Sequence, residues 1–262
     1  MRRVRIEVRD VSKAFGGVQA VRHCTLTVEP GTVTGLIGPN GAGKSTLFDI
    51  VAGFTRPDAG RVLLDGRDVT DLPPHRRFHL GLVRTFQIPR VFARMTVEEN
   101  LRLVPPRQPG EKLFVSWLAW PRVVRREREI AARAAEVLEL LGLLHLRDEL
   151  AGHLSGGQKK LLEFGRVLMS PCRTVLLDEP GAGVNRTLLG RLAALIERLA
   201  REEGYTFCVV EHDMDLVARL CDPVIVMAEG TVLARGSFDE VRRDRRVLEA
   251  YLGGTLGAEA EP

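Results

Sequence analysis

Residues 38–46 carry the pattern G-x-x-x-x-G-K-[S/T], preceded by the apolar run Val33 to Ile37. This spacing predicts a loop between a strand and a helix, in which glycines allow successive backbone N–H groups to point at a bound phosphate. The free N–H groups and positive dipole of the following helix would add to that attraction. Lys44 would place a cation between the β- and γ-phosphates of a nucleotide, and Ser45 would offer its hydroxyl to Mg²⁺. A glycine-rich turn that binds nothing is the alternative, and the context argues against it.

Two adjacent acids follow a second apolar run. Thr174–Leu177 is typical of a buried parallel strand, and Asp178 and Glu179 come directly after it. Burying two carboxylates is costly unless they have partners, which indicates a function. We expect Asp178 to hold Mg²⁺ through its water shell and Glu179 to polarise an attacking water. The alternative is that both acids cap the next turn.

Polar residues also stand at the ends of two further predicted strands. Gln87 follows Leu82–Phe86, and His212 lies just beyond Thr206–Val210. Ligand contacts in α/β sheets are found at the carboxyl ends of strands. A neutral His212 imidazole could hydrogen-bond a γ-phosphate. For Gln87, a loop position facing water is the alternative.

Two more features could contact a nucleotide. In Leu154–Gln158, Ser155 can cap a helix while the adjoining glycines expose their N–H groups, which predicts a second anion site. Near the N-terminus, Phe15 precedes a glycine turn, and its ring could stack on a purine base. A lone Phe beside a turn more commonly belongs to a core.

The order of the elements predicts an α/β fold. Alternating apolar and polar positions between residues 4 and 37 predict a small antiparallel sheet. Downstream, strands alternate with helices, which predicts a parallel central sheet, and residues 238–251 are expected to be helical. Apolar residues at helical spacing within residues 88–154 predict an inserted helical subdomain. We expect one domain over residues 1–253, with its core in residues 1–87 and 155–253, and a frayed tail over residues 254–262.

The composition is that of a globular protein. The chain has 262 residues, of which 45% are hydrophobic and 27% charged. No apolar run reaches the length of a membrane span, so any membrane role is expected to be peripheral. The basic N-terminus lacks a following apolar run, which predicts no signal peptide and a location inside the cell. The four cysteines lack C-x-x-C spacing and are expected to be buried thiols.

Taken together, these motifs resemble those of the nucleotide-binding subunit of ATP-binding cassette (ABC) transporters, over almost the whole chain. The resemblance implies a P-loop NTPase core that binds ATP and Mg²⁺ and hydrolyses ATP. It makes Gln87 part of the Q-loop, residues 154–158 the signature motif, residues 175–179 the second Walker motif and His212 the switch histidine. The implied catalytic residues are Glu179, His212 and Gln87, and the implied metal ligands are Ser45, Gln87 and Asp178. The implied ATP contacts are Phe15, Gly38, Pro39, Asn40, Gly41, Ala42, Gly43, Lys44, Ser45, Thr46, Ser155, Gly156, Gly157 and Gln158.

The resemblance also implies partners and a place in the cell. It predicts a peripheral protein on the cytoplasmic side of the membrane, bound to membrane-spanning permease subunits and paired with a second cassette as a homo- or heterodimer. An extracytoplasmic solute-binding protein would act indirectly. Residues 181–185 take the place of the D-loop, where Asn185 replaces the usual Asp and Arg186 a frequent Pro. This departure bears on the coupling between paired sites.

Within the family, the chain is most similar to the cassettes of branched-chain amino acid importers. The residues responsible are Thr34–Asn40, Gly81–Gln87, Glu211–Val217 and Val247–Gly253. This similarity implies an ATPase that energises uptake of branched-chain or other amino acids. Cassettes of amide or urea import and of lipopolysaccharide export remain open.

Other classes fit less well. The net charge of +4 could favour nucleic acid, but arginines and acids are interleaved, so no nucleic-acid partner is expected. Repair cassettes carry long heptad segments and translation cassettes carry two copies of each motif, and the sequence has neither. An inactive regulatory cassette would lack Lys44, Glu179 or His212, and all three are present.

An uncharged run, Leu113–Trp120, contains both tryptophans. The favoured interpretation is that it packs on the helical subdomain. The alternative is an exposed patch beside the docking site of a permease helix, with Arg122, Arg125 and Arg126 meeting lipid phosphates or permease acids.

Overall fold

The computed structural model describes residues 3–85, 90–106 and 120–256. Contacts between residues divide the chain into two units. The first unit comprises Met1–Gln87, Cys172–Ala182 and Leu189–Pro262, and the second comprises Ile88–Pro171 and Gly183–Leu188.

A six-stranded sheet lies in the first unit. Its order is β10-β9-β3-β8-β7-β6, in which neighbouring strands from β9 to β6 are parallel and β10 is antiparallel to β9. The strands β3, β7 and β8 are buried along their whole length, as expected of apolar runs covered on both faces. The strands are β3 (Val33–Ile37), β6 (Leu82–Arg84), β7 (Thr174–Asp178), β8 (Thr206–Val210), β9 (Val224–Ala228) and β10 (Thr231–Gly236).

The register of this sheet brings three strand ends to one edge. Leu36 of β3 and Asp178 of β7 both pair with Val210, the last residue of β8. The residues that follow these strands therefore share one edge of the sheet, because parallel strands end on the same side. The phosphate loop begins at this edge, and Glu179 and His212 lie at it.

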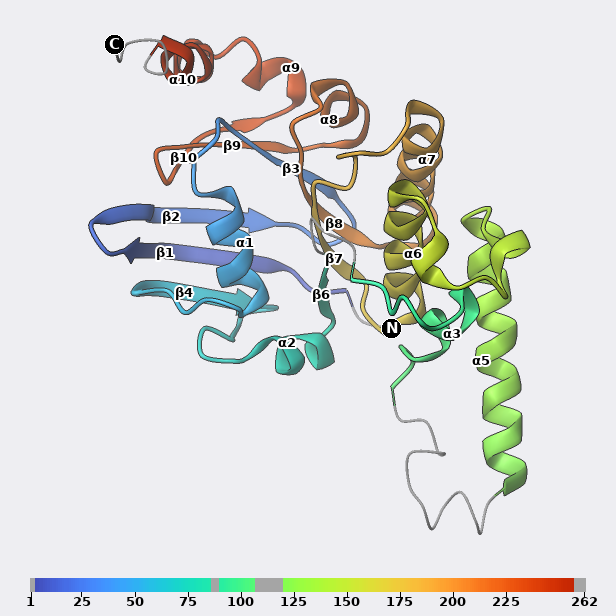
Figure 1. Ribbon diagram of the computed structural model, residues 1–262. Helices are drawn as coiled ribbons and strands as arrows, with labels where there is room; N and C mark the ends of the chain where they lie inside the picture. Colours follow the sequence, from blue (N-terminus) through green and yellow to red (C-terminus); the bar gives the residue numbers. More distant parts are fainter. Residues whose placement is uncertain (1–2, 86–89, 107–119, 257–262) are drawn as a thin grey trace. The chain divides into compact units, whose positions relative to one another are not determined.

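The first unit also contains an antiparallel sheet, ordered β2-β1-β4-β5. Figure 1 shows β2, β1 and β4 side by side, in blue to cyan. The predicted α/β class, with its parallel sheet and N-terminal antiparallel sheet, is confirmed. The strands are β1 (Ile6–Phe15), β2 (Val18–Val28), β4 (Ala59–Leu64) and β5 (Arg67–Asp68).

A single apolar core joins the two sheets of this unit to α1 (Lys44–Ala52). Phe48 and Ile50 of α1 pack in one cluster with Val8 and Val11 of β1 and with Leu36 of β3. Burying such side chains contributes about 1.5–3 kcal/mol each. The helix that follows the phosphate loop is therefore fixed by the same core that holds the strand before it.

The remaining helices of the first unit include two departures from expectation. The helix α2 was not predicted. The helix expected over residues 238–251 is instead two helices, α9 and α10. Ser237 caps α9, and the Asp244 carboxylate accepts the backbone N–H of Arg246 at 2.9 Å where α10 begins. These helices are α2 (Pro74–Leu80), α8 (Met214–Leu220), α9 (Phe238–Val241) and α10 (Arg245–Leu256), together with most of α7 (Arg186–Glu203).

The second unit is helical. In α6, Gly165 allows a close approach, since a Cβ there would lie 2.7 Å from Leu141 Cδ1 and 3.1 Å from Leu101 Cδ2. The buried Asn100 side chain binds the loop before α3, donating to the carbonyl of Thr96 at 2.8 Å and accepting from the N–H of Phe92 at 2.8 Å. Among the helices described, none combines the length and apolarity needed to cross a bilayer. The elements are α3 (Val97–Arg102), α5 (Trp120–Leu140), α6 (Gly156–Met169) and the 3₁₀ turns η2 (Leu144–Leu146) and η3 (Ala151–His153).

Candidate functional site

The loop between β3 and α1 depends on glycine at two points. Gly38 has φ 149° and Gly43 has φ 93°. A Cβ at Gly38 would lie 2.0 Å from the carbonyl oxygen of Met227, and a Cβ at Gly43 would lie 2.2 Å from that of Ala20. Neither oxygen can move without breaking its strand. The loop is thus held against neighbouring backbone in a conformation that only glycine permits.

Lys44 opens α1 and bends back over its own loop. Its ammonium donates to the carbonyl oxygens of Gly38 at 2.7 Å and Pro39 at 2.9 Å, and the residue is 6% exposed. Burial lowers the pKa of Lys44, while the nearby charges of Glu179 and Asp178 oppose that change. A cation and two carboxylates from distant parts of the sequence therefore meet at the carboxyl edge of the sheet.

Asp178 is paired inside the protein. Its Oδ2 accepts from Arg84 Nη2 at 2.8 Å, and the other terminal nitrogen of Arg84 binds Asp49 on α1. The side chains of Arg84 and Asp178 are 9% and 8% exposed, whereas that of Asp49 is 40% exposed. The sequence predicted a role for Asp178 but none for the other two, since their contact joins residues far apart in the chain.

Glu179 and His212 form a contact just beyond their strands. His212 Nε2 lies 3.3 Å from Glu179 Oε1, and their side chains are 46% and 21% exposed. Glu179 has φ 48°, an unusual value for a residue other than glycine, and its N–H donates to the carbonyl of Val210 at 2.9 Å. Strained backbone held by such a bond is common where a side chain must be aimed. The carboxylate and imidazole are thus brought together at the open end of the site.

Glu211 holds this region in place and was not predicted to do so. It is 4% exposed, and its carboxylate accepts from the backbone N–H groups of Gly181 at 2.5 Å and His212 at 3.0 Å. One side chain thereby ties the turn after Glu179 to the turn that carries His212. Glu211 stands directly after the apolar strand β8, as Glu179 stands directly after β7, and that position was the available signal.

Arg77 supports α1 at its C-terminus, the end away from the phosphate loop. It is 1% exposed and donates to the carbonyl oxygens of Ile50 and Val51 at 2.7 Å each, and of Leu72 at 2.9 Å and Thr70 at 3.0 Å. Carbonyls at the end of a helix lack partners within the helix. The Arg77 guanidinium donates to these carbonyls at the C-terminus of α1. Burial lowers the pKa of this guanidinium.

The predicted second anion site lies in the second unit. Ser155 and Gln158 form a reciprocal capping box at the start of α6, with Ser155 Oγ accepting from the N–H of Gln158 at 3.3 Å. A Cβ at Gly157 would lie 2.8 Å from Leu188, whereas the Cα of Gly156 faces open space. In the same unit Asn185 Oδ1 accepts from the N–H of Leu188 at 2.9 Å. An amide at position 185 therefore supplies the acceptor that a carboxylate would give.

The other predicted site residues are placed as follows. Phe15 is 52% exposed and is not part of the core, and Lys13 Nζ lies 5.4 Å from the centre of its ring. Ser45 is exposed at the start of α1. Gln87 lies outside the described residues, as do residues 113–119 of the uncharged run. Trp120, which ends that run, begins α5 and is 62% exposed.

Mg²⁺ fits the donors at the strand edge. Among the residues that the structure describes, no three His, Cys, Asp or Glu side chains cluster as a metal site. Mg²⁺ does not need such a cage, because it is usually held by one or two protein oxygens together with waters and phosphate oxygens. The Asp178 carboxylate and the exposed Ser45 hydroxyl are donors of that kind.

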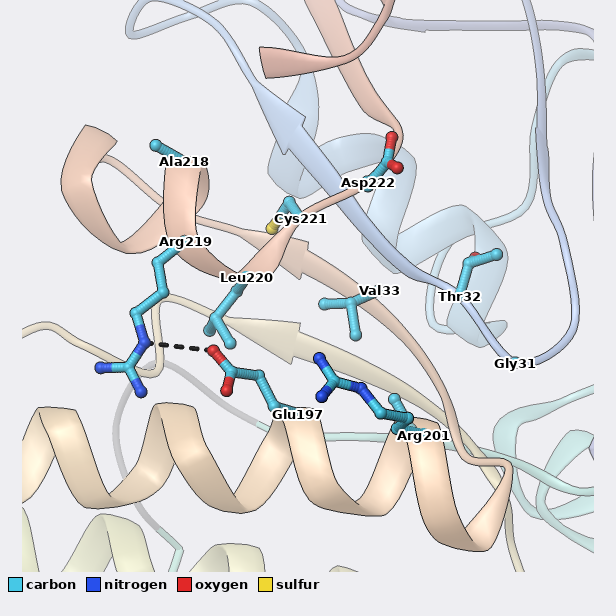
Figure 2. Close-up of a pocket in the computed structure, with 11 residues that line it drawn as sticks. Gly31, Thr32, Val33, Glu197, Arg201, Ala218, Arg219, Leu220, Cys221 and Asp222 are labelled. Carbon is cyan, nitrogen blue, oxygen red and sulfur yellow. Dashed lines mark hydrogen bonds and ion pairs between the residues drawn. The ribbon is translucent and has the colours of Figure 1, made fainter. Parts of the chain in front are cut away.

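A pocket of about 480 Å³ lies away from this edge. Its lining includes Val33, where β3 begins, so it lies at the opposite end of β3 from the phosphate loop. Figure 2 shows Glu197 of α7 paired across it with Arg219 of α8, at 3.1 Å. The pocket contains none of the residues predicted to bind nucleotide.

Comparison with known proteins gives two family matches. Residues 21–182 match the family described as ABC transporter. Residues 231–255 match a family described as branched-chain amino acid ATP-binding cassette transporter. The first match spans the phosphate loop, Asp178 and Glu179, and the second spans β10, α9 and most of α10.

Individual relatives cover nearly the whole chain. A probable branched-chain amino acid transport ATP-binding protein, LivG of Archaeoglobus fulgidus, is 42% identical over 95% of both chains. The high-affinity branched-chain amino acid transport ATP-binding protein BraF of Pseudomonas aeruginosa is 39% identical over 97% of this chain and 99% of its own. Among solved structures, the ADP conformation of an ATP-binding cassette of an ABC transporter is 38% identical with a TM-score of 0.80, covering 95% of this chain and 99% of that one.

Proposed function

The chain belongs to the ATP-binding cassette transporter family, and from this premise we propose that it is the ATP-binding and ATP-hydrolysing subunit of an importer of branched-chain amino acids. The observation that carries the proposal is the meeting of Lys44 with Asp178 and Glu179 at the edge where the glycine-rich loop begins. A phosphate needs a cation and backbone donors, and hydrolysis needs a carboxylate beside them.

Binding is assigned to the loop and its helix. The backbone N–H groups of residues 38–46 and the start of α1 bind the phosphates, and Lys44 exchanges its loop carbonyls for phosphate oxygens. Phe15, exposed on β1, stacks on the purine. Ser45 and Asp178 would hold Mg²⁺, with Gln87 as a further ligand, and the ion would supply charge neutralisation at the phosphates.

We assign hydrolysis to Glu179 and His212, which lie just beyond β7 and β8. Glu179 accepts a proton from, or polarises, the attacking water, and His212 contacts the γ-phosphate from the adjacent turn. Their mutual distance of 3.3 Å lets one group orient the other before substrate is bound. Gln87 is assigned to the same step on the strength of the family resemblance alone.

The signature segment is proposed to act on a second cassette. Ser155 caps α6 by accepting the N–H of Gln158, and the N–H groups of Gly156 and Gly157 at that helix end suit the γ-phosphate of an ATP held by the opposite Lys44. The active form is then a dimer, homomeric or heteromeric. It acts on the cytoplasmic side of the membrane, bound to permease subunits that receive solute from an extracytoplasmic binding protein.

Dimer formation is tested by enzymology. Specific ATPase activity should rise with protein concentration, and Glu179→Gln should trap an ATP-bound dimer on size exclusion. A chain that stays monomeric with ATP and hydrolyses at a rate independent of concentration would remove the dimer from the proposal.

Cargo is tested through the partners. The match of residues 231–255 and the names of the relatives favour branched-chain amino acids over amides, urea or lipopolysaccharide. Permeases and a binding protein from the same operon should co-purify with the chain, and leucine-loaded binding protein should stimulate its ATPase. Stimulation by urea-loaded protein or by lipopolysaccharide components would assign a different cargo.

A further inference from the structure

Arg84 is placed between two carboxylates from different elements. Its Nη2 lies 2.8 Å from Asp178 Oδ2 at the end of β7, and its Nη1 binds Asp49 Oδ1 on α1. The guanidinium carbon also lies 5.9 Å from the ring centres of Phe48 and Phe54. The ion pair with Asp178 is therefore largely shielded from water. Electrostatic interactions are stronger in such an environment than in water.

The backbone fixes Arg84 at this point. β6 runs parallel to β7, with Arg84 paired to Leu176, and the N–H of the next residue, Thr85, donates to the carbonyl of Leu176 at 2.9 Å. The backbone of Arg84 is therefore held against β7. Its side chain, which contacts both carboxylates, can give up the buried one and keep the half-exposed one.

We propose that Arg84 is a positioning residue whose ion pair with Asp178 competes with Mg²⁺ for that carboxylate, so that Asp178 gives up the guanidinium, which stays with Asp49, when the Mg²⁺-nucleotide complex binds. The inference rests on the proposed function, in which Asp178 is a metal-binding carboxylate. It assigns to β6 and Asp49 a part in metal-nucleotide binding that neither the sequence motifs nor the comparisons give them.

The direction of the effect follows from charge. A guanidinium on Asp178 opposes the approach of a divalent cation to the same carboxylate, so loss of Arg84 favours metal-nucleotide binding. Asp49 acts in the opposite sense, because it accepts the guanidinium that Asp178 gives up. Without the Asp49 charge, Asp178 no longer shares the guanidinium with a second carboxylate, and binding of the metal complex becomes weaker.

A purely structural role makes a different prediction. If the three side chains only joined α1 to the sheet, Arg84→Gln and Asp49→Asn would both lower stability, and neither would change how nucleotide binding depends on Mg²⁺. Arg77 offers a matched control, since it is a buried arginine whose hydrogen bonds to α1 go to backbone carbonyls rather than to Asp49 or Asp178.

The test measures binding of a fluorescent ADP analogue at a series of free Mg²⁺ concentrations, with melting temperature recorded for each protein. The measured quantity is the Mg²⁺ concentration at which the enhancement of analogue binding by Mg²⁺ is half-maximal. Compared with wild type, this concentration should fall by about threefold or more in Arg84→Gln and rise by a similar factor in Asp49→Asn. Arg77→Lys should lower the melting temperature and leave this concentration unchanged.

Shifts of the two variants in the same direction, or no shift in Asp49→Asn, would overturn the assignment of Arg84. Asp49→Asn alters a half-exposed side chain and keeps the test decisive if Arg84→Gln does not fold. Failure of the wild-type protein to bind the analogue at any Mg²⁺ concentration would instead refute the proposed function, and the inference with it.

Discussion

Replacing Arg77 with methionine should destabilise the first unit strongly, although Arg77 touches no predicted site residue. The substitution keeps a long apolar stem and removes the guanidinium. Four backbone carbonyls then lose a donor. The Ile50 carbonyl retains the N–H of Gly53 at 3.1 Å, which leaves the other three to bear the loss.

The magnitude follows from those bonds. Each buried carbonyl left without its donor costs about 1–3 kcal/mol, and removing a buried charge returns part of its desolvation cost. We expect a net loss of about 3 kcal/mol in the free energy of unfolding, which is a large part of the ~5–15 kcal/mol typical of a folded protein. At ~2–4 °C per kcal/mol, the melting temperature should fall by about 6–12 °C.

Urea unfolding followed by circular dichroism measures this loss, with Arg76→Met as the matched control. Arg76 is the exposed neighbour on α2, and its substitution should change the free energy of unfolding by less than about 0.5 kcal/mol. Equal stability of the two variants, or a loss below about 1 kcal/mol for Arg77→Met, would refute the assignment of Arg77 as the C-terminal support of α1.

Further outcomes are expected. Glu179→Gln should retain ATP affinity and lose at least about 100-fold in turnover, whereas Lys44→Ala should weaken binding itself, and comparing nucleotide titration with phosphate release separates the two. Gly165→Ala should cost about 1–3 kcal/mol in thermal unfolding, since its Cβ would lie 2.7 Å from a leucine methyl, and an unchanged melting temperature would show that α5 and α6 can separate. Burial raises the pKa of Cys24 and Cys221 to about 12, so a thiol reagent at pH 8 should react slowly with the native protein and rapidly after denaturation; fast native labelling would contradict this.

Local patterns predicted much of the fold. Apolar runs marked β3, β7 and β8, and the capping residue Ser155 marked the start of α6. These signals lie within a few residues of one another in sequence. The helix α2 gave no such signal, because most of its seven residues are basic or half-exposed and show no apolar stripe.

Long-range pairing explains the part of the site that was missed. Arg84 meets Asp49 and Asp178 across 35 and 94 positions of sequence, and Glu211 meets Gly181 across 30. Nothing in the spacing of single residues identifies such partners. The motif residues Lys44, Asp178, Glu179 and His212 were predicted, but their supports Arg77, Arg84 and Glu211 required the fold. The catalytic and binding roles stay predictions until the variants are measured.

The central claim is tested most directly by solute uptake in proteoliposomes that contain the permease subunits, the chain and its partner cassette, with ATP at the cassette side and leucine-loaded binding protein on the other. The account predicts leucine accumulation that requires ATP and Mg²⁺ and is abolished by Glu179→Gln. Leucine movement that persists without ATP or with the Gln variant, or an assembled complex that hydrolyses ATP without moving any amino acid, would contradict it.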